Sequence, residues 1–326
     1  MSNEPGASAT SRKKQRDRLL NLLKIAVSLA GLAVLLFTRL DLEQVWQRLL
    51  DTDWLLFLLA LALFLSGALV RAYRWGALVW ALGIQVSWWR LAELVFVGTF
   101  FGLFLPTGIG GDAVKMYELS RDDHKAAAAI SSVLVDRFLG LFVLFAMALL
   151  ALLGGYRMVA AQYRIIIAAI FVVCLLAAAL LLQRTWIEAW GRRLGLDRWL
   201  GRIKILRELY ESLHLYGLAA LARATLASVV WNLILILGYY CLGRAVDMDL
   251  SLWYYFLFVP IISSLLLVPS VGGLGIREGG TVVLFSQVVD ENHAAALALT
   301  FDLTLLITGL IGALLYVIQG LREART

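Results

Sequence analysis

Polar chemistry is scarce in this sequence. Charged residues make up 16% of its 326 positions, and it has four prolines, three histidines and two cysteines. Cys174 and Cys241 both fall inside apolar runs and lie far apart along the chain, so neither a disulfide framework nor a metal site is predicted. His124, His214 and His293 are scattered near loop positions without the spacing of metal ligands.

Motifs for nucleotides are also missing. The sequence has no G-x-x-x-x-G-K-[ST] phosphate loop, which argues against direct use of ATP. Its short basic runs lie beside apolar segments and do not resemble a nucleic-acid-binding surface. We therefore expect no cofactor, no metal and no nucleic-acid partner.

Hydrophobic residues, in contrast, make up 61% of the chain, and its mean hydropathy is +0.83. About 20 apolar residues in a helix cross the roughly 30 Å hydrocarbon layer of a bilayer. Six runs of about this length predict transmembrane helices: Leu20–Phe37, Trp54–Val70, Ile130–Leu153, Ile165–Leu182, Ala222–Leu242 and Ala295–Ile318. The fold class predicted is therefore an all-α polytopic membrane protein with six to eight transmembrane helices.

Two further apolar segments, Leu91–Leu105 and Leu252–Val268, each lead into a similar motif, L-P-T-G-I-G-G-D at 105–112 and V-P-S-V-G-G-L-G at 268–275. Proline and glycine at membrane depth free backbone groups that lipid cannot satisfy. Helices broken at corresponding places in two halves indicate a transporter-type binding site. We expect two broken, re-entrant hairpins related as an inverted repeat; full crossings by the short segments remain the alternative.

The glycines of these motifs would permit positive φ and close backbone approach, and would expose backbone N–H groups to an anion at a helix N-terminus. The alternative is a glycine-rich contact between helices. Asp112 would oppose a phosphate if it pointed into the site, but as the N-cap of a helix that begins near Asp112–Lys115 it could turn back to the backbone. The turn residues are Pro106, Gly108, Gly110 and Gly111 in the first motif, and Pro269, Gly272, Gly273 and Gly275 in the second.

The placement of Lys and Arg predicts the orientation. With alternating spans, twenty of these residues fall on the side of the N-terminus and five on the other. Basic residues concentrate on the cytoplasmic side, so both termini are expected there. Residues 1–18 would form a disordered basic head, and residues 19–326 a single membrane domain. Within it, residues 184–221 would form a cytoplasmic amphipathic connector.

Charges inside the apolar regions are the candidate functional residues, because an unpaired charge in the bilayer costs about 2.5–3.5 kcal/mol or more. Arg137 has the geometry to bind a phosphate with two hydrogen bonds, while Asp136 would pair with another cation or hold the Arg137 guanidinium. Asp302 is isolated in the sequence, and Asn232 suggests an interhelical hydrogen bond. The candidates for head-group binding are Lys115, Arg137, Arg277, Arg71 and Arg74; those for ion pairing or proton coupling are Asp112, Asp136, Glu278 and Asp302.

Taken together, these motifs resemble the transmembrane region of the lysylphosphatidylglycerol synthase superfamily. The resemblance rests on Gly102-x-x-x-Leu-Pro106-Thr-Gly-Ile-Gly-Gly-Asp112, on Asp136-Arg137-Phe-x-Gly140 and on Val268-Pro-Ser-Val-Gly-Gly-Leu-Gly-Ile-Arg-Glu278. In the full-length synthases this region moves aminoacylated phosphatidylglycerol to the outer leaflet, and a separate soluble domain transfers the amino acid. The resemblance implies a stand-alone, flippase-like member without that soluble domain, in a bacterial inner membrane.

The resulting functional hypothesis is a lipid translocator, or a lipid-binding transporter, for a phosphate-bearing or isoprenoid lipid. The movement would be downhill or driven by ions or protons through Asp136, Glu278 or Asp302. Two alternatives stay open: a membrane-embedded transferase acting on a lipid phosphate, and a non-transporting accessory subunit of a lipid-synthesis system. The expected partner is a membrane lipid, with a second copy of the chain or a lipid-synthesis protein as further candidates.

Overall fold

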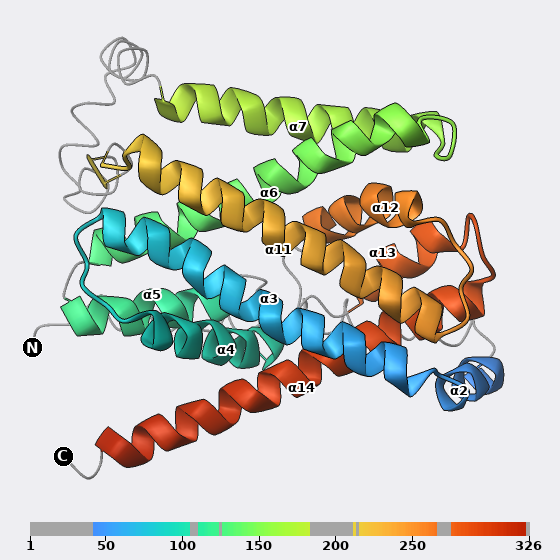
Figure 1. Cartoon of the computed structure of the whole chain (residues 1–326), viewed down its shortest axis with the longest axis horizontal. Helices are drawn as coiled ribbons and strands as arrows, with labels where there is room; N and C mark the ends of the chain where they lie inside the picture. The colour runs from blue at the N-terminus through green and yellow to red at the C-terminus, as the bar shows by residue number, and fades with distance from the viewer. Residues whose placement is uncertain are drawn as a thin grey trace, which may run out of the picture.

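A computed structural model describes the chain at residues 42–104, 110–123, 126–182, 211–212, 215–265 and 275–323. Over these ranges the ordered elements are helices, without β-strands, which confirms the all-α prediction (Figure 1). Several predictions lie outside the described residues: the basic head, the span Leu20–Phe37, most of the 184–221 connector, and the turn residues Pro106, Gly108, Pro269, Gly272 and Gly273.

Among the described residues, five helices are long and apolar enough to cross a bilayer. They are α3 (Trp54–Ala81), α6 (Ala126–Gly155), α7 (Ala161–Leu182), α11 (Leu218–Ala245) and α14 (Glu291–Glu323). The shortest has 22 residues, about 33 Å at 1.5 Å per residue. Each contains one of the predicted spans. The multi-pass membrane prediction is therefore confirmed for this part of the chain.

Helix α3 continues well past the predicted end of its span. The apolar run stops at Val70 because Arg71 and Arg74 follow, yet the helix extends to Ala81. Arg74 is buried inside the bundle rather than placed in water. The end of the apolar run at Val70 therefore marks where the polar site begins, whereas the helix itself continues to Ala81.

Four shorter helices come in two pairs. Helices α4 (Trp88–Phe104) and α5 (Gly110–Asp123) pack on each other, as do α12 (Leu252–Leu265) and α13 (Ile276–Phe285). With 17, 14, 14 and 10 residues, they are about 25, 21, 21 and 15 Å long. Each is shorter than the roughly 30 Å hydrocarbon layer. A helix of nine residues, α2 (Leu42–Leu50), precedes α3.

The helix order long–short–short–long occurs twice, as α3–α4–α5–α6 and as α11–α12–α13–α14. Helices α3 and α11 begin 164 residues apart, at residues 54 and 218. Helices α4 and α12 begin at the same spacing, at residues 88 and 252. The turn after the first helix also repeats at this spacing. Gly83 (φ 73°) and Asp247 (φ 62°) both take the left-handed conformation that ends a helix. These correspondences indicate an internal structural repeat.

The two halves run in opposite directions. The backbone N–H of Asp53, before α3, donates to the carbonyl of Ala245, at the end of α11, at 2.8 Å, and Figure 1 shows these helices lying along each other. Gly238 leaves room for the ring of Phe64, which lets the helices approach closely. An antiparallel arrangement of equivalent helices is the geometry of an inverted repeat.

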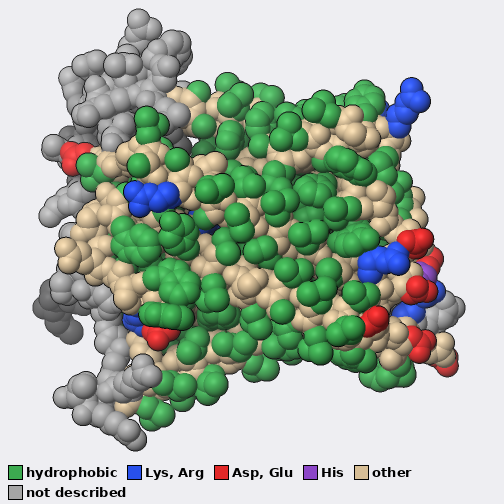
Figure 2. Space-filling view, in the orientation of Figure 1, with side chains coloured by type: hydrophobic (Ala, Val, Ile, Leu, Met, Phe, Trp, Pro, Cys, Tyr) green, Lys and Arg blue, Asp and Glu red, His purple; other side chains and the backbone are tan. Residues whose placement is uncertain are grey.

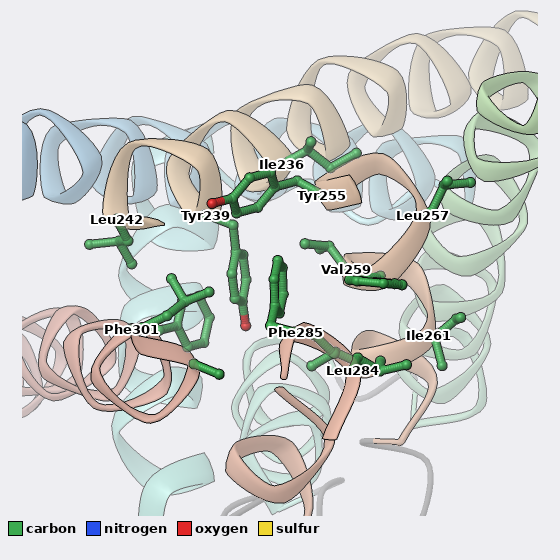
Figure 3. Packing of buried hydrophobic residues seen from close by; sticks show 14 of the residues in the cluster. Ile236, Tyr239, Leu242, Tyr255, Leu257, Val259, Ile261, Leu284, Phe285 and Phe301 are labelled. Atoms are coloured by element: carbon green, nitrogen blue, oxygen red, sulfur yellow. The ribbon is translucent and has the colours of Figure 1, made fainter. Parts of the chain in front are cut away.

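The surface fits a bilayer environment. Figure 2 shows hydrophobic side chains over most of the visible face, with charged side chains gathered toward its two ends. Inside, one apolar cluster includes Tyr239, Phe258, Phe285 and Phe301 (Figure 3). A second surrounds Trp75 on α3 and α4. The polar site lies between these two packed regions.

Candidate functional site

A cavity of about 300 Å³ lies between the two halves of the repeat. Every long helix except α7, and every helix of the two short pairs, contributes to its wall. Apolar side chains such as Leu103, Leu141 and Leu305 line part of it. The structure also brings all five predicted head-group residues to this cavity: Arg71, Arg74, Lys115, Arg137 and Arg277.

Arg74 of α3 and Asp136 of α6 form a buried two-pronged ion pair. Arg74 Nε donates to Asp136 Oδ1 at 2.6 Å, and Nη2 donates to Oδ2 at 2.7 Å. Both residues are 4% exposed. Gly140, one turn along α6, has no side chain to obstruct the guanidinium. Of the two roles open to Asp136, the structure therefore shows pairing with a cation other than Arg137.

Asp112 of α5 is shared by two cations. Lys115 Nζ lies 2.6 Å from Asp112 Oδ1, and Arg137 Nε donates to Oδ2. The Lys115 ammonium also lies 5.3 Å from the ring centroid of Trp75, a favourable position over an aromatic face. We refer to Arg74, Asp136, Asp112, Lys115 and Arg137 as the first-half cluster.

The expected capping role of Asp112 is wrong. Helix α5 is already formed at Gly110, so Asp112 lies within its first turn. Its carboxylate contacts Lys115 and Arg137. The cations outcompete the backbone because Asp112 is buried, and a carboxylate left unpaired at that depth would cost several kcal/mol.

The prediction of positive φ for the glycines of the first motif is also wrong where it can be checked, whereas that of close backbone approach is confirmed at Gly111. Gly110 and Gly111 are helical, and in the described part of the chain positive φ occurs at Gly83 and Gly275 among the glycines. A Cβ on Gly111 would overlap the carbonyl oxygen of Gly98 in α4. The alternative interpretation, a close helix–helix contact, is therefore correct at Gly111.

In the second half, a single guanidinium serves two carboxylates. Arg277 Nη2 donates to Glu278 Oε1 at 2.9 Å and also to Asp302 Oδ1 on α14. Asp302 is therefore not isolated, although nothing near it in the sequence supplies a cation. The Arg277 guanidinium lies 5.0 Å from the ring centroid of Phe301. We refer to Arg277, Glu278 and Asp302 as the second-half cluster.

Gly275 holds this cluster in place and has the predicted positive φ, at 81°. Its backbone N–H donates to Glu278 Oε2 at 2.5 Å, at the start of α13. A side chain at Gly275 would disfavour this backbone conformation. The turn thus orients Glu278 toward Arg277.

Arg71 differs from the other four basic residues. Its guanidinium lies 5.3 Å from the ring centroid of Trp231 on α11. In the part of the chain that the structure describes, no carboxylate lies within ion-pair distance of it. Arg71 is half-buried and lines the cavity. It therefore brings positive charge to the cavity without a carboxylate partner.

Sequence reasoning missed the aromatic platforms Trp75 and Trp231. Tryptophan in membrane proteins concentrates at the two interfaces, so Trp231, in the middle of the predicted span Ala222–Leu242, was an available signal, whereas Trp75 lies beyond the end of its span. Asn232, next to Trp231, was predicted to make an interhelical hydrogen bond. This is confirmed, because Asn232 Nδ2 donates to the carbonyl of Gly140 on α6 at 3.2 Å.

These features define a class: a polytopic helical membrane protein with an inverted repeat and a basic internal cavity. Comparison with known proteins identifies the family. Residues 21–313 match the model of the lysylphosphatidylglycerol synthase transmembrane region, and the chain belongs to this family. It is also 28% identical over 118 residues to a UPF0104 membrane protein of Archaeoglobus fulgidus. That alignment covers 36% of this chain and 36% of the relative. The resemblance based on the motifs is thus confirmed, and it relates the chain to lipid handling.

Proposed function

We propose that this protein is a flippase-like lipid translocator that holds a phosphate-bearing head group in the central cavity. The observation that carries the proposal is Arg71, a cation on the cavity wall that has an aromatic platform but no carboxylate partner among the described residues. An anion is the ligand that would complete this arrangement.

Charge balance supports an anionic ligand. The first-half cluster contains three cations and two carboxylates, and Arg71 adds a fourth cation beside them. The formal surplus is two positive charges in a site surrounded by apolar helices. Uncompensated charge is costly at low dielectric. A phosphate ester carries one to two negative charges and would balance this surplus.

The size of the cavity supports a head group rather than a whole lipid. Its volume of about 300 Å³ is at the lower end for small-molecule sites. Acyl or isoprenoid chains would remain in the bilayer, against the apolar outer surface seen in Figure 2. Arginines suit the head group because a guanidinium binds a phosphate with two parallel hydrogen bonds.

The inverted repeat supplies a route for movement. In our proposal the pairs α4–α5 and α12–α13 are re-entrant and enter from opposite faces of a bacterial inner membrane. Both termini lie in the cytoplasm, as the distribution of Lys and Arg indicates. Rocking of one half against the other would open the cavity alternately to each leaflet, as in other transporters with inverted repeats.

Binding and movement of a defined lipid test this function. The full-length protein is reconstituted with phosphatidylglycerol or, as an uncharged probe, diacylglycerol with the same chains. Native mass spectrometry measures binding, and fluorescent phosphatidylglycerol reports movement between leaflets. Arg71→Gln should weaken phosphatidylglycerol binding by about ten- to a hundredfold, because a charge-assisted hydrogen bond contributes about 1.5–3 kcal/mol. Diacylglycerol should bind poorly to both proteins.

Arg164 provides a matched control, since it also lies on an aromatic ring, that of Tyr156, but outside the cavity. Arg164→Gln should leave binding unchanged. Equal binding by the wild type and Arg71→Gln would contradict the head-group site. Binding without movement between leaflets would favour the accessory-subunit alternative over a translocator.

A further inference from the structure

The second-half cluster combines two carboxyl groups with one buried guanidinium. Arg277 is 6% exposed and Glu278 4% exposed, and the Asp302 side chain is 23% exposed. With both carboxyl groups ionised, the cluster carries one uncompensated negative charge. In contrast to the first half, no lysine accompanies these residues in the described part of the chain.

The two carboxyl groups also lie close together. Oε1 of Glu278 and Oδ1 of Asp302 both accept a hydrogen bond from the same nitrogen, Nη2 of Arg277. Two like charges this close also repel strongly, which favours a single shared proton.

Among the described residues, no second cation is within ion-pair distance of these carboxyl groups. Tyr239 of α11 faces the cluster, and in Figure 3 its ring lies between those of Phe301 and Phe285. On α12, Tyr255 faces Tyr240 and Arg244 instead. Several other charged side chains on helices that pack against α14 have partners elsewhere: Arg48 of α2 lies near Asp290, Arg90 of α4 contacts Gln319 and Glu93, Arg74 of α3 pairs with Asp136, and Arg244 of α11 pairs with Asp249.

We propose that the Glu278–Asp302 pair is a proton-binding site and that one proton bound there couples lipid movement to the proton gradient. This inference rests on the proposed function. Binding forms one O–H bond on a carboxylate oxygen, and release returns that proton to water. No bond in the lipid is made or broken.

Arg277 links this proton site to the cavity. It lines the cavity wall, and its buried Nε has no hydrogen-bond partner among the described residues. With both carboxylates ionised, Arg277 is held in the second-half cluster. Protonation removes one of its anionic partners, so its donors become available to a phosphate in the cavity. The proton and the anionic head group therefore favour each other's binding.

Infrared spectroscopy of the full-length protein tests the proton site directly. At neutral pH the wild type should show the C=O band of a protonated carboxyl group, and Asp302→Asn should lack it. Glu278→Gln gives a second test should the first variant fail to fold. Asp290→Asn, directly before the same helix, is the matched control and should retain the band. A wild-type spectrum without the band would overturn the proposal.

Transport in vesicles tests the coupling. With the membrane potential held at zero, a difference of one pH unit should shift labelled phosphatidylglycerol about tenfold between leaflets, if one proton accompanies each lipid. Asp302→Asn should move the lipid without responding to the gradient, whereas Asp290→Asn should behave as the wild type. Wild-type movement that ignores the gradient would overturn the coupling and leave the translocator intact. Failure of the lipid to move under any condition would overturn both.

Discussion

The two halves of the repeat keep their carboxylates in equivalent places but differ in their cations. Asp112 and Glu278 lie 166 residues apart at the starts of α5 and α13, and Asp136 and Asp302 lie 166 residues apart on α6 and α14. The first half supplies its acids with cations from three helices. Among the described residues of the second half, Glu278 and Asp302 share one cation, Arg277.

Two equivalent positions account for much of this difference. At the 166-residue spacing Lys115 corresponds to Thr281, and at the 164-residue spacing Arg74 corresponds to Gly238. The same scaffold therefore carries a site with surplus positive charge and a site with surplus negative charge. This teaches that an inverted repeat can divide anion binding and proton binding between its halves without changing its architecture.

The largest effect is expected from breaking the first-half cluster at its core. Arg74→Ala would leave Asp136 buried without its two-pronged partner, which typically costs 3–5 kcal/mol. The double variant Arg74→Leu with Asp136→Leu removes both charges and should recover most of that loss. Denaturant titration in detergent micelles measures the free energy of unfolding. If Arg74→Ala were as stable as the double variant, the pair would not be buried as described.

A smaller loss is expected from separating the first pair of short helices. Gly111→Val places branched carbon against the Gly98 carbonyl, and overpacking of this kind typically costs about 1–3 kcal/mol. The same titration measures it. Gly279→Ala in the second pair is the control, because nothing lies within 4 Å of the added Cβ. A loss of similar size in both variants would point to general intolerance of substitution instead of the specific contact.

The sequence was sufficient to predict the spans that the structure describes, the two interrupted short segments and the five basic residues of the cavity. Each of these follows from hydropathy, from proline and glycine, or from the cost of charge in lipid. The partners of the charges were not predictable. Arg74 and Asp136 are 62 residues apart, and Arg277 and Asp302 are 25 apart. A helix that is apolar all round gives no stripe that shows which face meets its neighbours.

The errors had a related cause. Glycine serves equally for positive φ and for close backbone approach, so the motif alone could not tell Gly111, which is helical, from Gly275, which has positive φ. Asp112 could cap a helix or pair with cations. The choice depended on Lys115 and on Arg137, which α6 brings from a different part of the chain. Tertiary packing settled both questions.

The surplus of positive charge in the first-half cluster can be reduced while each of its carboxylates keeps at least one cationic partner. In Lys115→Met, Asp112 keeps its contact with Arg137, while the surplus of the first-half cluster together with Arg71 falls from two charges to one. Phosphatidylglycerol affinity should fall about tenfold, or roughly 1.4 kcal/mol, as measured by native mass spectrometry. An unchanged affinity would mean that Arg71 alone provides the electrostatic attraction. The infrared band of the second-half cluster should persist, since Lys115 belongs to the other half.

The smallest effect concerns the start of α14, which positions Asp302. Asp290 accepts hydrogen bonds from the backbone N–H groups of Asn292 at 3.0 Å and His293 at 3.1 Å, so Asp290→Ala should cost about 1 kcal/mol. Partial burial raises the pKa of Asp290, but hydrogen bonds from the side chain and backbone of His293 outweigh it and hold the pKa below its ordinary value of 3.8. Because the folded-state pKa is lowered, the stabilisation is complete above pH 3.8 and is lost as the pH falls through the folded-state value.

Denaturant titrations of the wild type and Asp290→Ala should therefore differ at neutral pH and converge in acid. Asp290→Asn should remain close to the wild type at neutral pH, because asparagine also caps helices well. A difference between wild type and Asp290→Ala that persisted unchanged into strong acid would show that packing of the side chain, not its charge, stabilises this end of α14. In that case the proton response of the second-half cluster could be measured down to low pH without interference from the cap.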